Sequence, residues 1–158
     1  MFNREDKIIL ECLQEGLEII ERPYEVIAEK AGLSEDETIE RVRYFKDEGI
    51  IRSLKAVLNH KLLGYNSNVM VVWKIPVEKV YFAGKVIANF KEVSHCYERE
   101  VVEGWKYNLF TMVHGKNAVD CIKVIEEISQ EIGIKDYEML FTEEEYKKSY
   151  MRYFGEES

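Results

Sequence analysis

Two adjacent strand-like runs between Val93 and Gly115 place the strongest constraint on the fold. The first run alternates two sets of residues: Val93, His95, Tyr97, Arg99 and Val101 against Ser94, Cys96, Glu98 and Glu100. The second run alternates Tyr107, Leu109, Thr111 and Val113 with Asn108, Phe110, Met112 and His114. Alternate residues of an extended strand share a face, so we expect His95, Tyr97 and Arg99 to project together. The sequence therefore predicts a β-hairpin, with a turn at Glu103-Gly104, that carries polar and aromatic side chains on one face.

The segments around this hairpin predict the rest of a ferredoxin-like domain over residues 65–158. We expect a central strand, a helix, a second helix and a last strand at residues 68–76, 80–90, 117–133 and 136–142. The order βαββαβ makes the second domain ferredoxin-like and the fold class α+β, with both helices on one face of the sheet. The other face must then meet a partner subunit, a ligand or the preceding domain. Residues 143–158 are charged but rich in aromatic rings, which predicts a C-terminal helix or arm that docks on another surface.

The N-terminal part predicts a winged helix-turn-helix domain over residues 1–64. Apolar residues recur at three- and four-residue spacing, which predicts helices at residues 5–20, 24–30 and 34–48. An apolar run at residues 50–58 follows the third helix and predicts one strand of a wing hairpin. Three short helices followed by a β-wing form a winged helix-turn-helix.

The charge pattern argues against a nucleic acid as the main partner. The chain has a formal net charge of −8. The third predicted helix, which would enter the major groove, carries six acidic side chains against three basic ones. DNA-binding affinity comes largely from neutralising phosphates, so this helix would be repelled. We therefore do not expect DNA to be a partner, although a DNA-binding regulator remains the alternative function.

The remaining composition predicts a reduced, cytoplasmic protein that does not enter a membrane. No apolar run approaches the ~20 residues of a membrane span, and the N-terminus lacks the pattern of a signal peptide. Cys12, Cys96 and Cys121 are scattered and form no Cys-x-x-Cys pair. Neither a zinc site nor a disulfide framework is therefore expected.

The predicted architecture resembles that of the Lrp/AsnC regulators, and the hairpin sequence is similar to the sirohaem decarboxylases. The hairpin resemblance lies in SHCYER (Ser94–Arg99), Trp105 and YNLFTMVHG (Tyr107–Gly115). Supporting segments are RPYEVIAEKAGL, EGIIR, LGYNSNVMVVW and FTEEEYKK. The likeness covers nearly the whole chain and is closer to the B-type subunit of that family than to the A-type.

The resemblance implies a carboxy-lyase. Members of the family remove carbon dioxide from two acetate side chains of sirohaem, leaving methyl groups and giving didecarboxysirohaem for alternative haem or haem d1 biosynthesis. The substrate is an iron tetrapyrrole and no separate cofactor is implied, although haem binding is possible. The implied active species is a heterodimer with a paralogous A-type subunit, or a homodimer. Besides the DNA-binding regulator, which would sense a small effector, a catalytically silent haem-binding partner remains a further alternative.

The chemistry of that reaction singles out two histidines. Losing carbon dioxide from an arylacetate leaves electrons that a pyrrole holds only when it is protonated or polarised. Histidine, with an ordinary pKa near ~6.5, supplies a proton around neutral pH. His95 and His114 are therefore the candidate catalytic acids, and either could instead ligate the sirohaem iron.

Further residues of the implied site would bind the acidic, flat substrate. Arginine forks suit carboxylates, which selects Arg99 in the hairpin and Arg52 in the wing. Flat rings would contact the macrocycle, and an amide would bind a carboxylate; these candidates are Tyr97, Trp105, Tyr107 and Asn108. Tyr97 and Trp105 could equally be packing residues. We expect Phe110 and Met112 to lie in the core, and Cys96 to be buried and inert.

Overall fold

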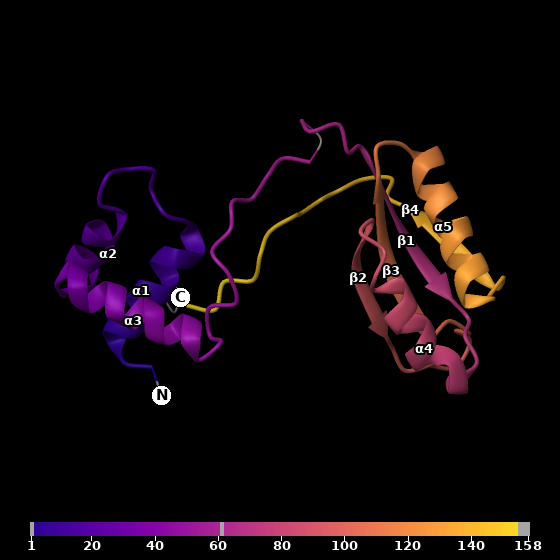
Figure 1. Ribbon diagram of the computed structural model, residues 1–158, viewed down its shortest axis with the longest axis horizontal. Helices are drawn as coiled ribbons and strands as arrows, with labels where there is room; N and C mark the ends of the chain where they lie inside the picture. Colours follow the sequence, from indigo (N-terminus) through magenta and orange to yellow (C-terminus); the bar gives the residue numbers. More distant parts are fainter. Residues whose placement is uncertain (1, 61, 155–158) are drawn as a thin grey trace. The chain divides into compact units, whose positions relative to one another are not determined.

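The computed structural model describes residues 2–60 and 62–154 (Figure 1). Its contacts divide the chain into two compact units. One unit combines Met1–Val57 with Lys147–Ser158, and the other is Leu58–Tyr146. We call them the helical unit and the sheet unit.

The helical unit contains α1 (Arg4–Glu15), α2 (Pro23–Ala31) and α3 (Glu35–Asp47). A capping box begins α1 and another begins α3, where the hydroxyl of Ser34 accepts from the backbone N–H of Glu37. The first helix was predicted to reach residue 20, and this prediction is wrong. Gly16 ends α1 because it adopts a φ of 112°, which lies outside the helical region.

The predicted wing strand at residues 50–58 is wrong. Residues 52–59 form neither helix nor strand, and all of them are exposed. A strand needs a hydrogen-bonded partner, and an isolated hairpin is at best marginally stable. Within the described part of the helical unit no strand is available to pair with this segment, so its apolar residues remain in contact with water.

Residues 147–154, the described end of the C-terminal segment, dock on the helical unit without forming a helix. The side chain of Gln14 donates to the carbonyl oxygen of Met151 at 3.1 Å and accepts from the backbone N–H of Tyr153 at 3.3 Å. The ring of Phe154 packs edge-to-face against Phe2, with centroids 5.8 Å apart. An aromatic side chain thus anchors this segment as an arm. The sequence predicted either a helix or an arm.

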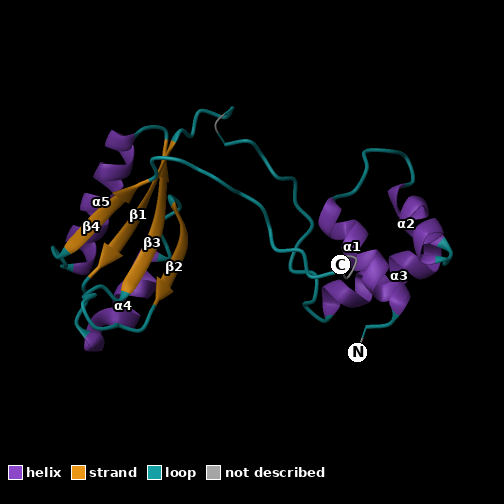
Figure 2. Ribbon diagram, turned by 180° about the vertical axis from the view of Figure 1, so that it is seen from behind, coloured by secondary structure: helices purple, strands orange, loops and turns teal. Residues whose placement is uncertain are grey.

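The sheet unit has the predicted βαββαβ order. Its elements are β1 (Ser67–Trp73), α4 (Val77–Ile87), β2 (Val93–Glu98), β3 (Leu109–Gly115), α5 (Ala118–Ile132) and β4 (Tyr137–Phe141). The strands form an antiparallel sheet in the order β2-β3-β1-β4. Figure 2 shows the strands in front of α4 and α5, so both helices cover the same face.

The core of the sheet unit lies between this face and the two helices. Val69, Val71 and Trp73 of β1 are fully buried there, and the indole N–H of Trp73 donates to the hydroxyl of Thr111 at 2.9 Å. In the described residues of this unit, neither helix packs on the opposite side of the sheet. We call that side the open face.

A β-bulge interrupts the pairing of β2 with β3. Val93 pairs with Val113, but His95 already pairs with Met112, so Ser94 is an extra residue between them. As a result Val93 and Cys96 both pack against the core, whereas His95 projects from the open face. The expectation that Val93 and His95 share a face is therefore wrong.

Candidate functional site

The open face carries a strip of side chains whose positions follow from the strand register. Across β1 and β3, Asn68 lies opposite His114, Met70 opposite Met112, and Val72 opposite Phe110. Across β2 and β3, His95 lies opposite Met112 and Tyr97 opposite Phe110. The histidines therefore occupy one end of the strip, and the aromatic rings occupy the other. His114 follows Phe110 by four positions along β3, a length of ~14 Å at 3.4 Å per residue.

At the histidine end, one hydroxyl connects both candidate acids. The Oγ atom of Ser94 lies 2.7 Å from Nδ1 of His95 and 2.6 Å from Nε2 of His114. Both distances are in the range of good hydrogen bonds. Ser94 and His95 are exposed, and His114 is half-buried.

Ser94 is the site residue that sequence reasoning missed. Strict alternation assigns Ser94 to the face opposite His95, with Cys96 and Glu98. The bulge cancels that assignment and brings the hydroxyl beside both imidazoles. The alternation itself carries no signal of the bulge, so only the structure reveals this contact.

At the aromatic end, Phe110 is the centre of a cluster. The ring of Trp105 stacks on it at 6.5 Å with an interplanar angle of 14°, and the guanidinium of Arg99 lies 5.6 Å from its centroid. Tyr97 faces it across the strands and also contacts the ring of His95 at 5.9 Å. The prediction that Phe110 and Met112 lie in the core is wrong, because both side chains are half-buried on the open face.

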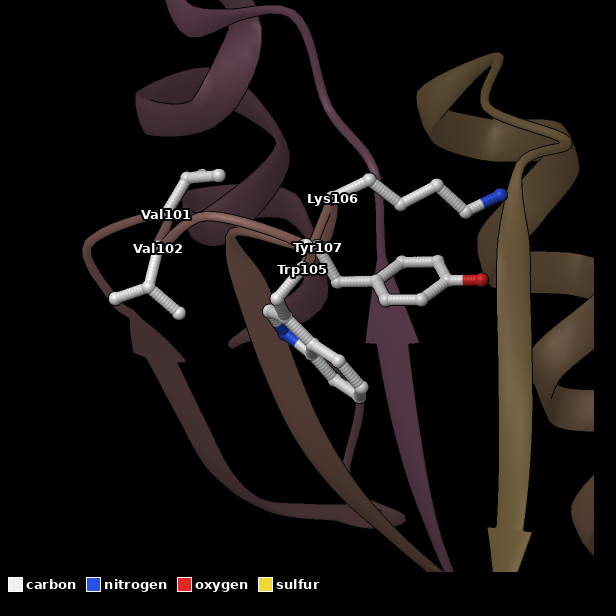
Figure 3. Close-up of a pocket in the computed structure, with 6 residues that line it drawn as sticks. Val101, Val102, Trp105, Lys106 and Tyr107 are labelled. Carbon is white, nitrogen blue, oxygen red and sulfur yellow. The ribbon is translucent and has the colours of Figure 1, made fainter.

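Trp105 and Tyr107 extend this cluster beyond the end of the strands. Their rings meet edge-to-face at 5.2 Å, and Trp105 remains 40% exposed. Figure 3 shows Tyr107 reaching across β1 toward β4, where its hydroxyl donates to the carboxylate of Glu138 at 3.2 Å. Both rings line a surface hollow of about 590 Å³, together with Val101 and Val102.

An ion pair links the segment that carries these rings to the residue before β4. The ammonium of Lys106 donates to the carboxylate of Asp136 at 2.9 Å, and that hydrogen bond lowers the pKa of Asp136 and raises the pKa of Lys106. On β2, burial raises the pKa of the Cys96 thiol, which favours its neutral form. Cys96 lies on the helix side, away from the histidines, as the sequence predicted, but it is half-buried rather than buried.

Asn108 has a structural role that the sequence did not predict. Its side chain is 8% exposed, and its amide accepts from the N–H of Ile75 at 2.9 Å and donates to the carbonyl oxygen of Ile75 at 2.7 Å. Both polar groups are thus engaged by one buried peptide segment. We therefore leave Asn108 out of the residues proposed to contact a ligand.

Arg52 is exposed and belongs to the helical unit, whereas the other candidates belong to the sheet unit. Its role remains a prediction. Among residues 2–60 and 62–154, no group of three or more His, Cys, Asp and Glu side chains could hold a metal ion.

Comparisons with known proteins identify the family. Residues 62–147 match a family described as the AsnC-like ligand binding domain, and residues 6–52 match the siroheme decarboxylase NirDL-like HTH domain. The siroheme decarboxylase beta subunit of Methanosarcina barkeri is 39% identical over 150 residues, which are 95% of this chain and 99% of that relative. The chain belongs to the sirohaem decarboxylase family. The resemblance predicted from the hairpin motif is thereby confirmed.

Solved structures agree with this membership. One match is the crystal structure of the siroheme decarboxylase NirDL in complex with an iron-uroporphyrin III analogue. It is 35% identical to this chain, with a TM-score of 0.72. The match covers 98% of this chain but 48% of the NirDL chain, so this chain spans about half the length of NirDL. The structure of E. coli AsnC is 21% identical to this chain, with a TM-score of 0.82. That match covers 96% of this chain and 98% of the AsnC chain. This likeness shows that the two proteins share a fold.

The helical unit of this sirohaem decarboxylase family member does not offer a basic recognition helix. The first turn of α3 holds Glu35, Asp36 and Glu37. One of its few cations, Arg41, is already paired with Asp6 of α1 at 2.8 Å. Phosphates would therefore meet carboxylates at the end of the helix that usually contacts bases.

Among the described residues, no helix is both long and apolar enough to cross a membrane.

Proposed function

We propose that this chain is a subunit of a sirohaem decarboxylase that removes carbon dioxide from two acetate side chains of sirohaem and yields didecarboxysirohaem. The product would serve alternative haem or haem d1 biosynthesis. One observation supports the proposal most directly. In a member of this family, two imidazoles joined through Ser94 lie on the same open face as a cluster of aromatic rings and an arginine.

The imidazoles supply what the reaction requires. When the bond to the carboxylate breaks, its electron pair stays on the methylene carbon, and a proton must replace the lost carbon dioxide. An imidazolium of His95 or His114 can deliver that proton. The alternative role, ligation of the sirohaem iron by one of them, would use a ring nitrogen in the same cluster.

The other end of the strip suits a flat, acid-fringed ligand. Tyr97 and Trp105 are partly exposed and offer apolar surface to a macrocycle. The guanidinium of Arg99 stacks on Phe110, which holds it in place for a bidentate contact with a rim carboxylate. Tyr107 positions Trp105 by an edge-to-face contact.

We infer that the chain works with a second, related subunit. The Methanosarcina barkeri relative is named a beta subunit, and the NirDL chain is about twice as long as this chain. An A-type subunit would therefore supply what the other half of NirDL supplies within one chain. A homodimer is the alternative arrangement.

Anaerobic incubation with sirohaem tests the proposal. The purified chain, alone and mixed with an A-type subunit, is expected to convert sirohaem into a product lighter by two carbon dioxide molecules, measured by mass spectrometry. His95→Ala and His114→Ala should each lower turnover by at least ~100-fold, the usual contribution of a general acid. His60→Ala, which changes the third histidine outside the cluster, is the matched control and should retain activity. Unchanged turnover in both cluster variants would exclude their catalytic role.

A further inference from the structure

The Ser94 hydroxyl stands between two ring nitrogens but carries one hydrogen. It can donate that hydrogen to Nδ1 of His95 or to Nε2 of His114, and it must accept an N–H hydrogen bond from the other ring. When both rings are neutral, two arrangements satisfy all three groups. Either both rings carry their proton on Nε2, or both carry it on Nδ1. The contact thus couples the proton positions of the two imidazoles.

We propose that Ser94 is a positioning residue that relays protons between His95 and His114 during decarboxylation. This inference rests on the proposed function. Two acetate groups must each receive one proton, so the acid that protonates the first methylene carbon must be recharged before the second. A relay through Ser94 supplies this acid with a proton from the second imidazole in the same step in which the acid gives one up.

The bond between the methylene carbon and the carboxylate breaks, carbon dioxide leaves, and the electron pair forms a new C–H bond with the proton on the ring nitrogen that faces away from Ser94. As that proton leaves, the nitrogen of the same ring that faces Ser94 takes the hydrogen of the Ser94 hydroxyl. Ser94 in turn takes the N–H proton of the other ring, an imidazolium, which becomes neutral and is recharged from solvent. No oxidation or reduction occurs.

The surroundings of Ser94 favour this role over a structural one. Ser94 is the bulged residue of β2, an edge strand, and it is exposed. Within the part of the chain that the structure describes, the side-chain hydroxyl bonds only to the two imidazoles. Removing the hydroxyl therefore changes the link between the rings and leaves the core contacts of Val93 and Cys96 in place.

Activity is the first test. Ser94→Ala should lower turnover by about 10–100-fold, less than loss of the acid itself, because water can partly replace the relay. Binding of sirohaem, followed by its absorbance, should stay unchanged. Ser94→Thr keeps the hydroxyl and suits an exposed strand position. Its turnover should therefore stay within about threefold of that of the unsubstituted chain. Undiminished turnover in Ser94→Ala would overturn the relay and leave the proposed function standing.

Ring nitrogen NMR is the second test and needs no turnover. In the ¹⁵N-labelled full-length chain at a pH where the rings are neutral, the fraction of Nδ1-protonated ring should be equal in His95 and His114. Ser94→Thr should preserve that equality. Unequal fractions in the unsubstituted chain would overturn the coupling whatever the activity. Equal fractions without decarboxylation, even with an A-type subunit present, would overturn the proposed function and leave the coupled pair intact.

Discussion

Replacing Asn108 by alanine should destabilise the sheet unit strongly without removing a ligand contact. The amide of Asn108 holds both the N–H and the carbonyl oxygen of Ile75, at 2.9 and 2.7 Å, and both residues are buried. Alanine removes the two hydrogen bonds and leaves both groups of the Ile75 backbone without a partner. Water can replace these hydrogen bonds only if it enters the buried site.

The expected loss of stability follows from the two backbone groups of Ile75 that lose their partners. Each buried donor or acceptor that is left unsatisfied costs about 1–3 kcal/mol. Two such groups, with some relaxation of the surrounding backbone, give an expected loss of about 3 kcal/mol in the free energy of unfolding. For a domain of this size, the midpoint temperature should fall on the order of 10–20 °C. Asn108→Asp should be no milder, because a carboxylate would face the carbonyl oxygen of Ile75.

Tryptophan fluorescence measures this effect in the sheet unit alone. Both tryptophans of the chain, Trp73 and Trp105, belong to that unit, and Trp73 is fully buried. Urea unfolding followed by their emission should show the loss for Asn108→Ala. Asn89→Ala, an exposed position at the end of α4, is the matched control and should change stability by less than ~0.5 kcal/mol. Wild-type stability combined with lost sirohaem binding would show that Asn108 is a ligand and that this reasoning is wrong.

Three further predictions concern binding, packing and pH. Arg99→Ala should weaken sirohaem binding more than haem binding in absorbance titrations, because haem has fewer carboxylates; equal losses would remove the anchoring role. Gly115→Ala should cost about 1–3 kcal/mol, because its Cβ would lie 2.8 Å from a thiol of α5, whereas Gly84→Ala meets nothing closer than 4.0 Å and serves as control. Hydrogen bonds from the hydroxyl and backbone of Ser34 lower the pKa of Glu37. Stability from that carboxylate is present above its unfolded-state pKa and lost as the pH falls through its folded-state pKa. Circular dichroism of acid unfolding should therefore show a flatter pH dependence in Glu37→Gln; an unchanged profile would contradict it.

Much of the fold could be predicted because burial leaves a period in the sequence. The apolar stripe of residues 117–133 and the alternation of β3 each specify one buried face, and both elements form as expected. The predicted wing failed for a different reason. An apolar run such as residues 50–58 has strand propensity, but pairing depends on a partner that a local pattern cannot reveal.

The site was harder to predict than the fold. His95 and His114 could be selected by residue type and by motif, and the structure connects them through Ser94. Phe110 was assigned to the core, yet β3 buries the alternate set of residues instead. Asn108 has the same polar groups as a ligand-binding amide, and only the position of Ile75 shows how they are used.

The packing of β2 explains why the two histidines meet at all. Val93 and Cys96 both contact the core beneath the sheet, although they are three positions apart and strict alternation would put them on opposite faces. An extra residue between them resolves this conflict, and the register places it at Ser94. Burying two such side chains contributes on the order of 2–4 kcal/mol, more than the cost of one interrupted ladder hydrogen bond at about 1 kcal/mol. The hydrophobic core on the helix side thus stabilises the bulge that positions a hydroxyl between two imidazoles on the open face.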